Sequence, residues 1–194
     1  MVTDAALDRV ELSNGEVLSA AQVGIMRHYA SLKSGKPDAF GKAAEGGWTE
    51  HVEGALGELA VSKYLGIHWP ATINTYRSQP DTGPYEVRTR SRHDYDLIIR
   101  ESDRDDAIYI LVTGICPIYC VRGWMVASEG KQPEFLQSYG HRPPAYFLPA
   151  ARLYPMATLS RNRSDSPGAA AAASGPAVSA AGGGPAPSGA PGRP

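Results

Sequence analysis

Cysteine is scarce in this chain. The 194 residues contain two cysteines, Cys116 and Cys120. Their spacing is not that of a Cys-x-x-Cys redox motif, and no second pair exists to complete a four-ligand zinc site. Both lie in an apolar segment, where free thiols are commonly buried. We therefore expect two buried thiols, with no disulfide framework and no zinc site.

The chain also lacks long apolar runs and an excess of either charge. No apolar run reaches the roughly 18 residues that suggest a membrane span, and the N-terminus has no charged-then-apolar signal pattern. We expect a cytoplasmic protein with no membrane partner. Lys and Arg number 19 against 20 Asp and Glu, a formal net charge of -1. Binding to nucleic acid would therefore need a local basic patch.

The C-terminal segment lacks almost every residue type that forms a core. After Asp165 every residue is Ser, Pro, Gly or Ala except Val178 and Arg193. Such a segment has little apolar surface to bury, so we predict that it is disordered. The predicted organisation is an N-terminal hairpin and helix (1–47), a core domain (48–160) and a disordered tail (161–194).

The N-terminal part predicts a hairpin followed by a helix. Apolar residues alternate on both sides of an Asn-Gly pair over residues 10–18, a pattern typical of a β-hairpin. Ser19 then fits the N-cap of a helix that continues to about Leu32. We expect Arg27 and His28 on the surface of this helix.

A second helix is predicted over residues 49–65, and its composition is informative. Gly54 and Gly57 lie in its middle, although each glycine costs a helix about 1 kcal/mol relative to alanine. Close approach to a sheet would offset that cost. Glu58 lies beside this small face and would be carried toward the sheet. A carboxylate that faces solvent or pairs locally is the alternative.

Apolar and alternating segments then predict several strands. Because helices come first and a mainly antiparallel meander follows, we predict the α+β class. The expected strands cover residues 85–91, 94–100, 108–113, 119–127 and 146–148, with a short helix over 133–139.

The stretch of residues 80–90 draws the most attention. It begins as a turn at Gly83 and Pro84 and continues as a strand. Val87 would face the core, while the opposite face carries one carboxylate and three guanidiniums, from Glu86, Arg88, Arg90 and Arg92. Such a row suits a hard cation next to a phosphate chain. A solvated edge strand of mixed charge is the alternative.

These residues resemble the PD-(D/E)xK nuclease superfamily. Pro80-Asp81 and Glu86-Val87-Arg88 match its two signature pieces, and Glu58 matches its helical Glu. Over residues 48–159 the chain also resembles small phage or prophage members, through the Gly-Glu-Leu-Ala, Val-Arg-Thr-Arg, Leu-Val-Thr-Gly and Arg-Gly-Trp segments. The resemblance implies a restriction-endonuclease-like core, with a central mixed sheet flanked by helices.

The chemistry implied by the resemblance is an endonuclease or phosphodiesterase that depends on Mg²⁺ or Mn²⁺ and acts on DNA. Asp81 and Glu86 would hold the metal with the backbone carbonyl of Val87, and Glu58 would hold a water or a second metal. The residues expected to contact DNA phosphates are Arg90, Arg92 and His93.

Two departures from the motif leave alternatives open. Arg88 stands where the superfamily usually has Lys. As a catalytic residue beside Glu58, Asp81 and Glu86 it could stabilise a pentacovalent phosphate or orient water, but an arginine cannot lose its proton to act as a base. Asp81 lies close to Glu86 in sequence, so Asp94 or Asp96 could fill the role of the metal-binding Asp. A catalytically degenerate member that binds DNA or protein is the alternative function. The form of the DNA and the oligomeric state, with a homodimer as one option, stay open.

Overall fold

The computed structural model describes residues 8–34, 47–73, 79–140 and 142–163. Its two long helices are α1 (Asn14–Lys33) and α2 (Gly47–Leu65). The strands are β1 (Asp8–Glu11), β2 (Tyr85–Arg90), β3 (Leu97–Arg100), β4 (Ile108–Ile115), β5 (Ile118–Val126), β6 (Leu136–Gln137) and β7 (Ala145–Leu148). The short helices are α3 (Ala127–Gly130), η2 (Pro133–Phe135), η3 (Ala150–Arg152) and η4 (Met156–Arg163). None of the described helices is long and apolar enough to cross a membrane.

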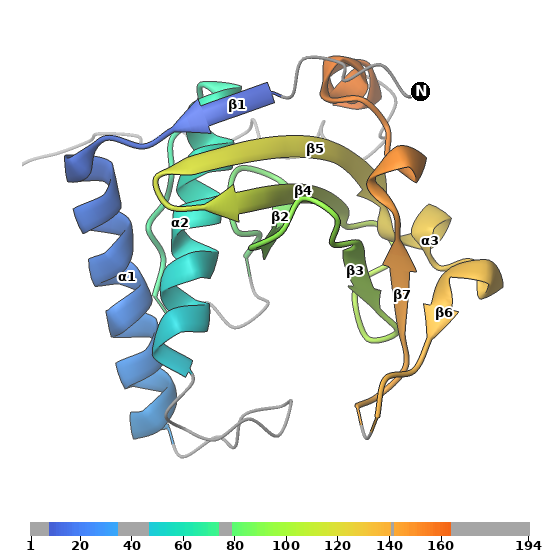
Figure 1. Ribbon diagram of the computed structural model, residues 1–194, viewed down its shortest axis with the longest axis horizontal. Helices are drawn as coiled ribbons and strands as arrows, with labels where there is room; N and C mark the ends of the chain where they lie inside the picture. The colour runs from blue at the N-terminus through green and yellow to red at the C-terminus, as the bar shows by residue number, and fades with distance from the viewer. Residues whose placement is uncertain (1–7, 35–46, 74–78, 141, 164–194) are drawn as a thin grey trace, which may run out of the picture. The chain divides into compact units, whose positions relative to one another are not determined.

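The strands form two sheets, so the protein is an α+β fold with a mixed sheet (Figure 1). The larger sheet has the order β1-β5-β4-β2, in which β2 runs parallel to β4 and the other neighbours are antiparallel. The smaller sheet is antiparallel, with the order β3-β7-β6. The expected mixed sheet is confirmed. The expected meander is wrong, because β3 leaves β2 to pair with β7 and β4 returns beside β2.

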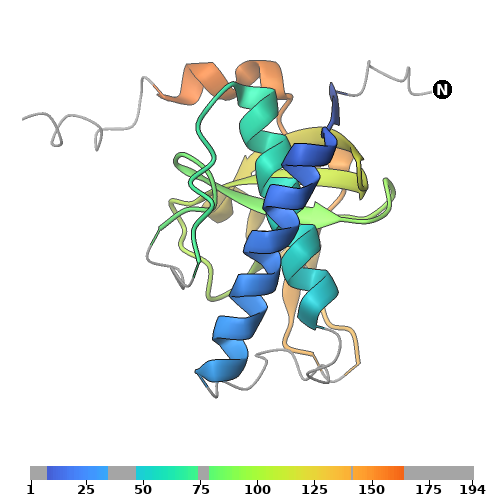
Figure 2. The same ribbon diagram turned by 90° about the vertical axis from the view of Figure 1, so that its left-hand side faces the viewer.

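Helices α1 and α2 pack against each other beside the larger sheet, with α2 next to the strands (Figures 1 and 2). One apolar core lies between α2 and this sheet, and a second lies between β4, β5 and the smaller sheet. Strand β4 contributes to both cores: Ile110 and Val112 face α2, while Tyr109 and Leu111 face the other side. The apolar sequence of β4 is thus buried on both faces of the strand.

The predicted N-terminal hairpin is wrong. Ser13 is the N-cap of α1, and it forms a capping box with Glu16: the Ser13 backbone N–H donates to the Glu16 carboxylate at 2.6 Å. The Asn-Gly pair therefore lies in the first helical turn, and the helix starts five residues before the predicted cap at Ser19. The preceding segment, β1, pairs with the distant β5 instead. Residues 13–16 carry both the Ser-x-x-Glu signal of a capping box and the Asn-Gly signal of a hairpin turn, and the pairing of β1 with β5 decides between them.

The chain divides into a compact unit that ends at Ser160 and a second unit, Arg161–Pro194. Only residues 161–163 of the second unit are described, so the predicted disorder of the tail lies outside the described residues. The remaining differences are small. The strand expected over 94–100 begins at Leu97, and the helix expected over 133–139 is the single turn η2 followed by β6.

The two glycines in the middle of α2 behave differently. A Cβ on Gly57 would lie within 2.8 Å of the Thr89 Cβ on β2, so only glycine permits this approach of helix and strand. A Cβ on Gly54 would meet nothing within 4 Å. The predicted close approach is therefore confirmed at Gly57 and wrong at Gly54. It places Glu58, the next residue, at the edge of the pocket described below.

Candidate active site

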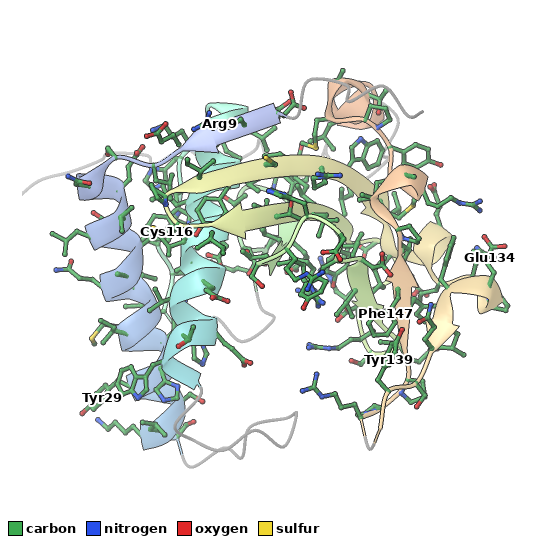
Figure 3. All side chains as sticks on the ribbon, viewed as in Figure 1. Arg9, Tyr29, Cys116, Glu134, Tyr139 and Phe147 are labelled. Atoms are coloured by element: carbon green, nitrogen blue, oxygen red, sulfur yellow. The ribbon has the colours of Figure 1, made fainter. Side chains whose placement is uncertain are left out.

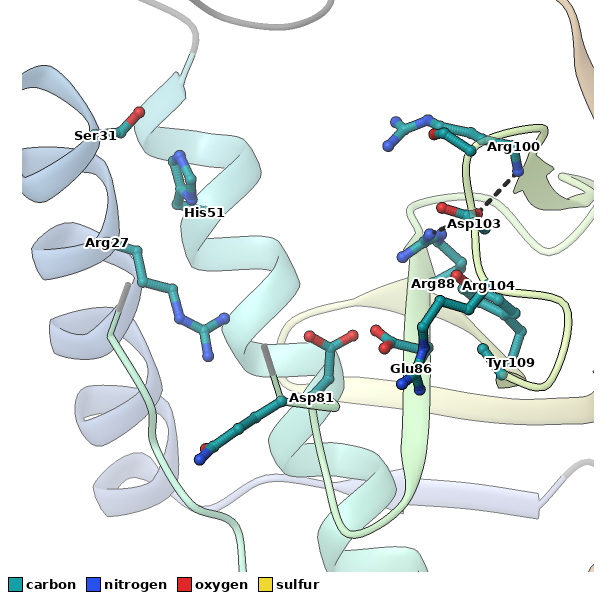
Figure 4. A pocket seen from close by; sticks show the side chains of 13 residues that line it. Arg27, Ser31, His51, Asp81, Glu86, Arg88, Arg100, Asp103, Arg104 and Tyr109 are labelled. Atoms are coloured by element: carbon teal, nitrogen blue, oxygen red, sulfur yellow. Dashed lines mark hydrogen bonds and ion pairs between the residues drawn. The ribbon is translucent and has the colours of Figure 1, made fainter. Parts of the chain in front are cut away.

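A pocket of about 300 Å³ opens between α1, α2, β2 and the β3–β4 connection (Figure 4). Its wall is rich in charge of both signs. The charged side chains that line it are Arg27, Asp81, Glu86, Arg88, Arg100, Asp103 and Arg104. They come from three separate parts of the chain, α1, residues 81–88 and residues 100–104, so the pocket exists only once the fold has formed.

The carboxylates of Asp81 and Glu86 lie side by side in this pocket (Figure 4). A tight turn places Asp81: the backbone of Thr82 exchanges hydrogen bonds with Tyr85, and the buried Thr82 hydroxyl is hydrogen-bonded to Ser62 on α2. The Asp81 carboxylate then accepts the backbone N–H of Val87 at 2.8 Å. Asp81 is thus fixed on the loop directly before β2, beside the first outward-facing residue of that strand.

The electrostatics of this pair are unusual for two surface acids. Burial raises the pKa of Glu86 to about 7, and the negative charge of Asp81 adds to the effect, while Arg88 and Arg104 oppose it. Two carboxylates so close together repel each other unless a proton or a cation lies between them. The pair can therefore hold a proton near neutral pH or bind a cation in its place.

Glu58 is the third acid predicted for the site, and it has another partner. Its carboxylate receives two hydrogen bonds from the Arg27 guanidinium, at 2.5 and 2.8 Å, and one from the Trp69 indole at 3.3 Å. The side chains of Arg27 and Glu58 are only 17% and 7% exposed. Burial raises the pKa of Glu58, an effect that Asp81 strengthens and Arg27 opposes. Arg27 also donates to the Thr72 carbonyl at 2.8 Å.

The prediction that Arg27 lies on the surface is therefore wrong, as is that for His28. Arg27 points from α1 toward Asp81 (Figure 4). The His28 ring is 4% exposed and packs 4.3 Å from the ring of Trp48, between the centroids. The face of α1 that is buried against α2 consists of Ala20, Gly24 and His28, which follow each other at intervals of four residues. The spacing of the two small residues could therefore have identified the packed side of this helix.

Arg88, at the motif position usually held by Lys, is held by a carboxylate of its own. Its guanidinium donates to Asp103 at 3.1 Å and to the Ile98 carbonyl at 3.3 Å, and it lies 4.5 Å from the centre of the Tyr109 ring. Asp103 also accepts the backbone N–H of Arg100 at 2.9 Å. This carboxylate therefore fixes both the orientation of Arg88 and the start of the β3–β4 connection.

The residues expected to contact DNA lie further along the chain and outside this pocket's lining. Arg90 and Arg92 place their guanidinium carbons 4.7 and 5.2 Å from the ring centre of Tyr95. Arg92 forms an exposed ion pair with Asp94 at 2.6 Å, and the His93 ring is hydrogen-bonded to Thr113 at 2.9 Å. Arg92, His93 and Asp94 line a separate, open hollow beside the β4–β5 turn.

The two alternative acids do not take the place of Asp81. Asp94 is committed to Arg92, and neither it nor Asp96 lines the pocket that holds Glu86. Asp81 is the acid that the fold brings next to Glu86.

Sequence reasoning missed Arg27, Asp103, Arg104 and Tyr109 as parts of the pocket. The charged turn that contains Asp103 and Arg104 gave no functional signal, because its position depends on β3 leaving the larger sheet. The positive charge of Arg104 lowers the pKa of Glu86 and so opposes the rise caused by burial. The Arg104 side chain is 62% exposed.

The three predicted acids do not form one metal cluster. Within the described ranges, no group of three or more His, Cys, Asp or Glu side chains is arranged to hold a metal ion. The resemblance assigns a water or a second metal to Glu58, whereas in the structure its carboxylate accepts hydrogen bonds from Arg27 and Trp69. Asp81 and Glu86 form the acidic pair, and Glu58 is bound to Arg27.

Comparison of the chain with protein-family models, with curated proteins and with solved structures finds no match in any of the three. The chemistry of the pocket is therefore the basis on which a function can be assigned.

Proposed function

We propose that this protein is a Mg²⁺- or Mn²⁺-dependent phosphodiester hydrolase that acts on DNA, with Asp81 and Glu86 as its acidic pair. The observation that carries the proposal is this pair of adjacent carboxylates, in a pocket surrounded by arginines and with the pKa of Glu86 raised to about 7. A cation relieves the repulsion between two such acids, and the arginines attract a phosphate chain.

The residues present fit a hard divalent ion. Mg²⁺ is commonly bound through one or two carboxylates, with water and substrate phosphate completing its oxygen shell. The backbone of Val87 can add a third oxygen. Its N–H points to Asp81 and away from β4, and the N–H and C=O of one strand residue lie on the same side. The Val87 carbonyl therefore faces the acidic pair along the free edge of β2.

A bound divalent ion would lower the pKa of a water and stabilise charge on the phosphoryl oxygens. Arginine side chains of the protein would interact with the phosphate. Arg88, held by Asp103 and Tyr109, stays protonated and can stabilise negative charge that develops on the phosphate, but it cannot remove a proton. Arg104 is exposed enough to move toward a phosphate beside Glu86.

Glu58 has a different role in this proposal from the one that the resemblance implies. Bound to Arg27 and Trp69, it orients the Arg27 guanidinium beside Asp81 and does not bind the ion. Arg27 then lies on the opposite side of the acidic pair from Arg88 (Figure 4). A phosphate at the pair would lie between two fixed positive charges.

One set of observations favours a second candidate, a module of the same fold that binds DNA or protein without cleavage. Glu58 and Arg88, two of the four predicted catalytic side chains, are both engaged in internal ion pairs. If those pairs persist when substrate binds, only Asp81 and Glu86 remain for chemistry.

A cleavage assay separates the two candidates. Single- and double-stranded DNA are incubated with the protein in Mg²⁺, in Mn²⁺ and in EDTA, and with the variants Asp81→Asn and Glu86→Gln. We expect metal-dependent cleavage that each variant lowers by at least about 100-fold, as for loss of a charge-stabilising group. Glu134→Gln, which changes an exposed carboxylate outside the pocket, is the matched control and should leave the rate unchanged.

Calorimetric titration with Mg²⁺ provides a second readout. The wild-type protein should bind the ion and Glu86→Gln should not. Metal-independent DNA binding that weakens steeply with salt, with no cleavage, would instead favour the second candidate. Cleavage that both pocket variants retain would contradict the assignment of the acidic pair.

A further inference from the structure

One face of the smaller sheet adjoins the pocket. Alternate residues of β3 and β7 contribute to the second core, and these are Leu97, Ile99, Tyr146 and Leu148. Because side chains alternate along a strand, the residues between them, which include Phe147, and the strand-end Arg100 face the other way. Arg100 lines the pocket, so this second face of the smaller sheet lies on the same side as the acidic pair.

Two aromatic rings lie together at this face. Phe147 packs against Tyr139 edge to face, with the ring centroids 4.9 Å apart and the ring planes at 75°. Figure 3 shows both residues beside β7. Tyr139 is 58% exposed, so more than half of its surface is open to solvent. An exposed aromatic ring next to a basic groove is the usual platform on which single-stranded nucleic acids stack their bases.

Two arginines without an acidic partner belong to the same region. Arg142 follows Tyr139 in the β6–β7 turn, where its backbone N–H donates to the Tyr139 carbonyl at 3.3 Å. This turn leads into β7, whose first residue pairs with Arg100. Arg90 ends β2, on the strand face that also carries Glu86. None of the ion pairs among the described residues includes Arg90 or Arg142.

The two arginines are close enough for their charges to repel. Burial lowers the pKa of Arg90 and the positive charge of Arg142 lowers it further, while Tyr95 and Asp96 oppose the shift. The Arg90 guanidinium is held 4.7 Å from the centre of the Tyr95 ring. Like charges held near each other are stabilised by a counter-charge between them, and the planar guanidinium matches the geometry of phosphate.

We propose that Arg90, Arg142 and Tyr139 form a binding surface for a single strand of DNA that extends from the acidic pair along β2. This inference rests on the proposed hydrolase function and names the form of its substrate. A phosphate lies between the two arginines, and a neighbouring base stacks on Tyr139. Glu86 and Arg90 are about 13 Å apart, at about 3.3 Å per strand residue, so the strand is held close to the bond that is cleaved.

The aromatic pair favours a single strand over a duplex. In a duplex the bases are stacked on one another and present only their edges in the grooves. The face of the Tyr139 ring would then have no base face to meet. In a single strand, each base can leave its neighbours and stack on a protein ring.

Fluorescence anisotropy tests this choice of substrate. A labelled oligonucleotide of about 20 nucleotides is titrated with the full-length protein in EDTA, once alone and once as a duplex with its complement. We expect the single strand to bind at least tenfold more tightly. Equal or tighter binding of the duplex would overturn the proposal.

Charge substitutions test the phosphate site. Arg90→Gln/Arg142→Gln should weaken binding of the single strand at least tenfold. It should also reduce the slope of log affinity against log salt concentration by about 0.7, the value for one phosphate contact with a single strand. Arg90→Lys/Arg142→Lys keeps both charges and should keep the wild-type slope. Arg9→Gln is the matched control, because Arg9 is 59% exposed and lies on β1, at the opposite edge of the larger sheet from β2.

Ring substitutions test the stacking site. Tyr139→Ala should weaken binding of the single strand at least fivefold, whereas Tyr139→Phe keeps the ring and should bind as the wild type does. Tyr29→Ala is the control, since Tyr29 is 54% exposed and lies on α1, far from β7 (Figure 3). Wild-type affinity in either Tyr139→Ala or the double glutamine variant would overturn the proposal.

Binding in EDTA separates this proposal from the hydrolase function. If the protein cleaves DNA in Mg²⁺ but the surface variants bind as the wild type does, the hydrolase stands and the binding surface is wrong. If the variants lose affinity and the wild type cleaves no DNA, the binding surface stands and the hydrolase is wrong.

Discussion

Two arginine–carboxylate pairs stand on opposite sides of the pocket, and they are built differently. Arg27 and Glu58 join α1 to α2 through two short hydrogen bonds, with both side chains nearly buried. Arg88 and Asp103 join β2 to the β3–β4 connection through a single contact at 3.1 Å, and a quarter of Arg88 is exposed. The helical pair is the more buried of the two, with its carboxylate only 7% exposed, whereas a quarter of the arginine in the strand pair is accessible.

The difference shows which charges are available for chemistry. Each arginine already has a carboxylate partner, so neither neutralises Asp81 and Glu86, which lie between them. Burial raises the pKa of Glu86, and the repulsion from Asp81 adds to that rise. We infer that the outer pairs fix the shape of the site and that the central pair binds the reactive ion.

Removing the carboxylate from the helical pair should have the largest effect on stability. Glu58→Ala leaves the Arg27 guanidinium buried without its partner, and breaking a buried pair from one side costs about 3–5 kcal/mol. We expect a value near 3 kcal/mol, because the Thr72 carbonyl still accepts from Arg27. The free energy of unfolding, from urea denaturation, measures it.

The matched control removes both partners at once. Arg27→Leu/Glu58→Leu should recover most of the lost stability, because replacing a buried ion pair with apolar side chains is often neutral. If the double variant is as unstable as Glu58→Ala, the pair acts through packing and not through its charges.

A substitution at Gly57 should change the distance between α2 and β2. A Cβ at this position would overlap the Thr89 side chain on β2, so Gly57→Ala should push α2 away from the strand and cost about 2 kcal/mol, as overpacking does. Gly54→Ala meets nothing within 4 Å and should stabilise the helix by about 1 kcal/mol. Thermal denaturation should give a lower melting temperature for Gly57→Ala and a higher one for Gly54→Ala. Equal effects would contradict the role of Gly57 as the contact point.

The sequence predicted the parts of this site that are local. The turn and the strand over residues 80–90 are determined by neighbouring residues in the sequence. The positions of Asp81, Glu86 and Arg88 on this short segment could therefore be predicted. The helix that carries Glu58 was also predicted, since Gly66 ends it with a positive φ of 65°. These features depend on backbone preferences that act within a few residues.

The partners of these side chains could not be predicted. Arg27 reaches Glu58 across 31 residues of sequence, and Asp103 reaches Arg88 across 15. Both contacts depend on tertiary packing: α1 against α2 in one case, and the departure of β3 to β7 in the other. The N-terminal error has the same cause, because β1 pairs with β5, more than a hundred residues away.

Breaking the Arg88–Asp103 pair should lower the free energy of unfolding less than breaking the Arg27–Glu58 pair does. Asp103→Ala removes the acceptor of both the Arg88 guanidinium and the Arg100 backbone N–H. We expect a loss of about 2 kcal/mol, because hydrogen bonds to charged groups contribute about 1.5–3 kcal/mol and the Arg88 guanidinium, a quarter exposed, can turn to water. Asp106→Ala, which removes a carboxylate that is 81% exposed, is the control and should change stability by less than about 0.5 kcal/mol. A loss as large as that of Glu58→Ala would remove the contrast between the two walls.

The smallest expected effect is a pH dependence of the free energy of unfolding that arises from the acidic pair of Asp81 and Glu86. Glu86 has its pKa raised from 4.5 to about 7 in the folded protein, so the folded state binds more protons than the unfolded state between these values. Its contribution to stability is complete below about pH 4.5 and is lost as the pH rises through 7. Glu86→Gln, which stays neutral, lacks this loss. In EDTA, the wild-type free energy of unfolding should therefore fall relative to that of Glu86→Gln by about 1 kcal/mol between pH 4.5 and 7.5, a value reduced for the half-exposed carboxylate. Subtracting the variant cancels the titration of Glu58, so a difference that stays constant with pH would mean that neither burial nor the charge of Asp81 raises the pKa of Glu86.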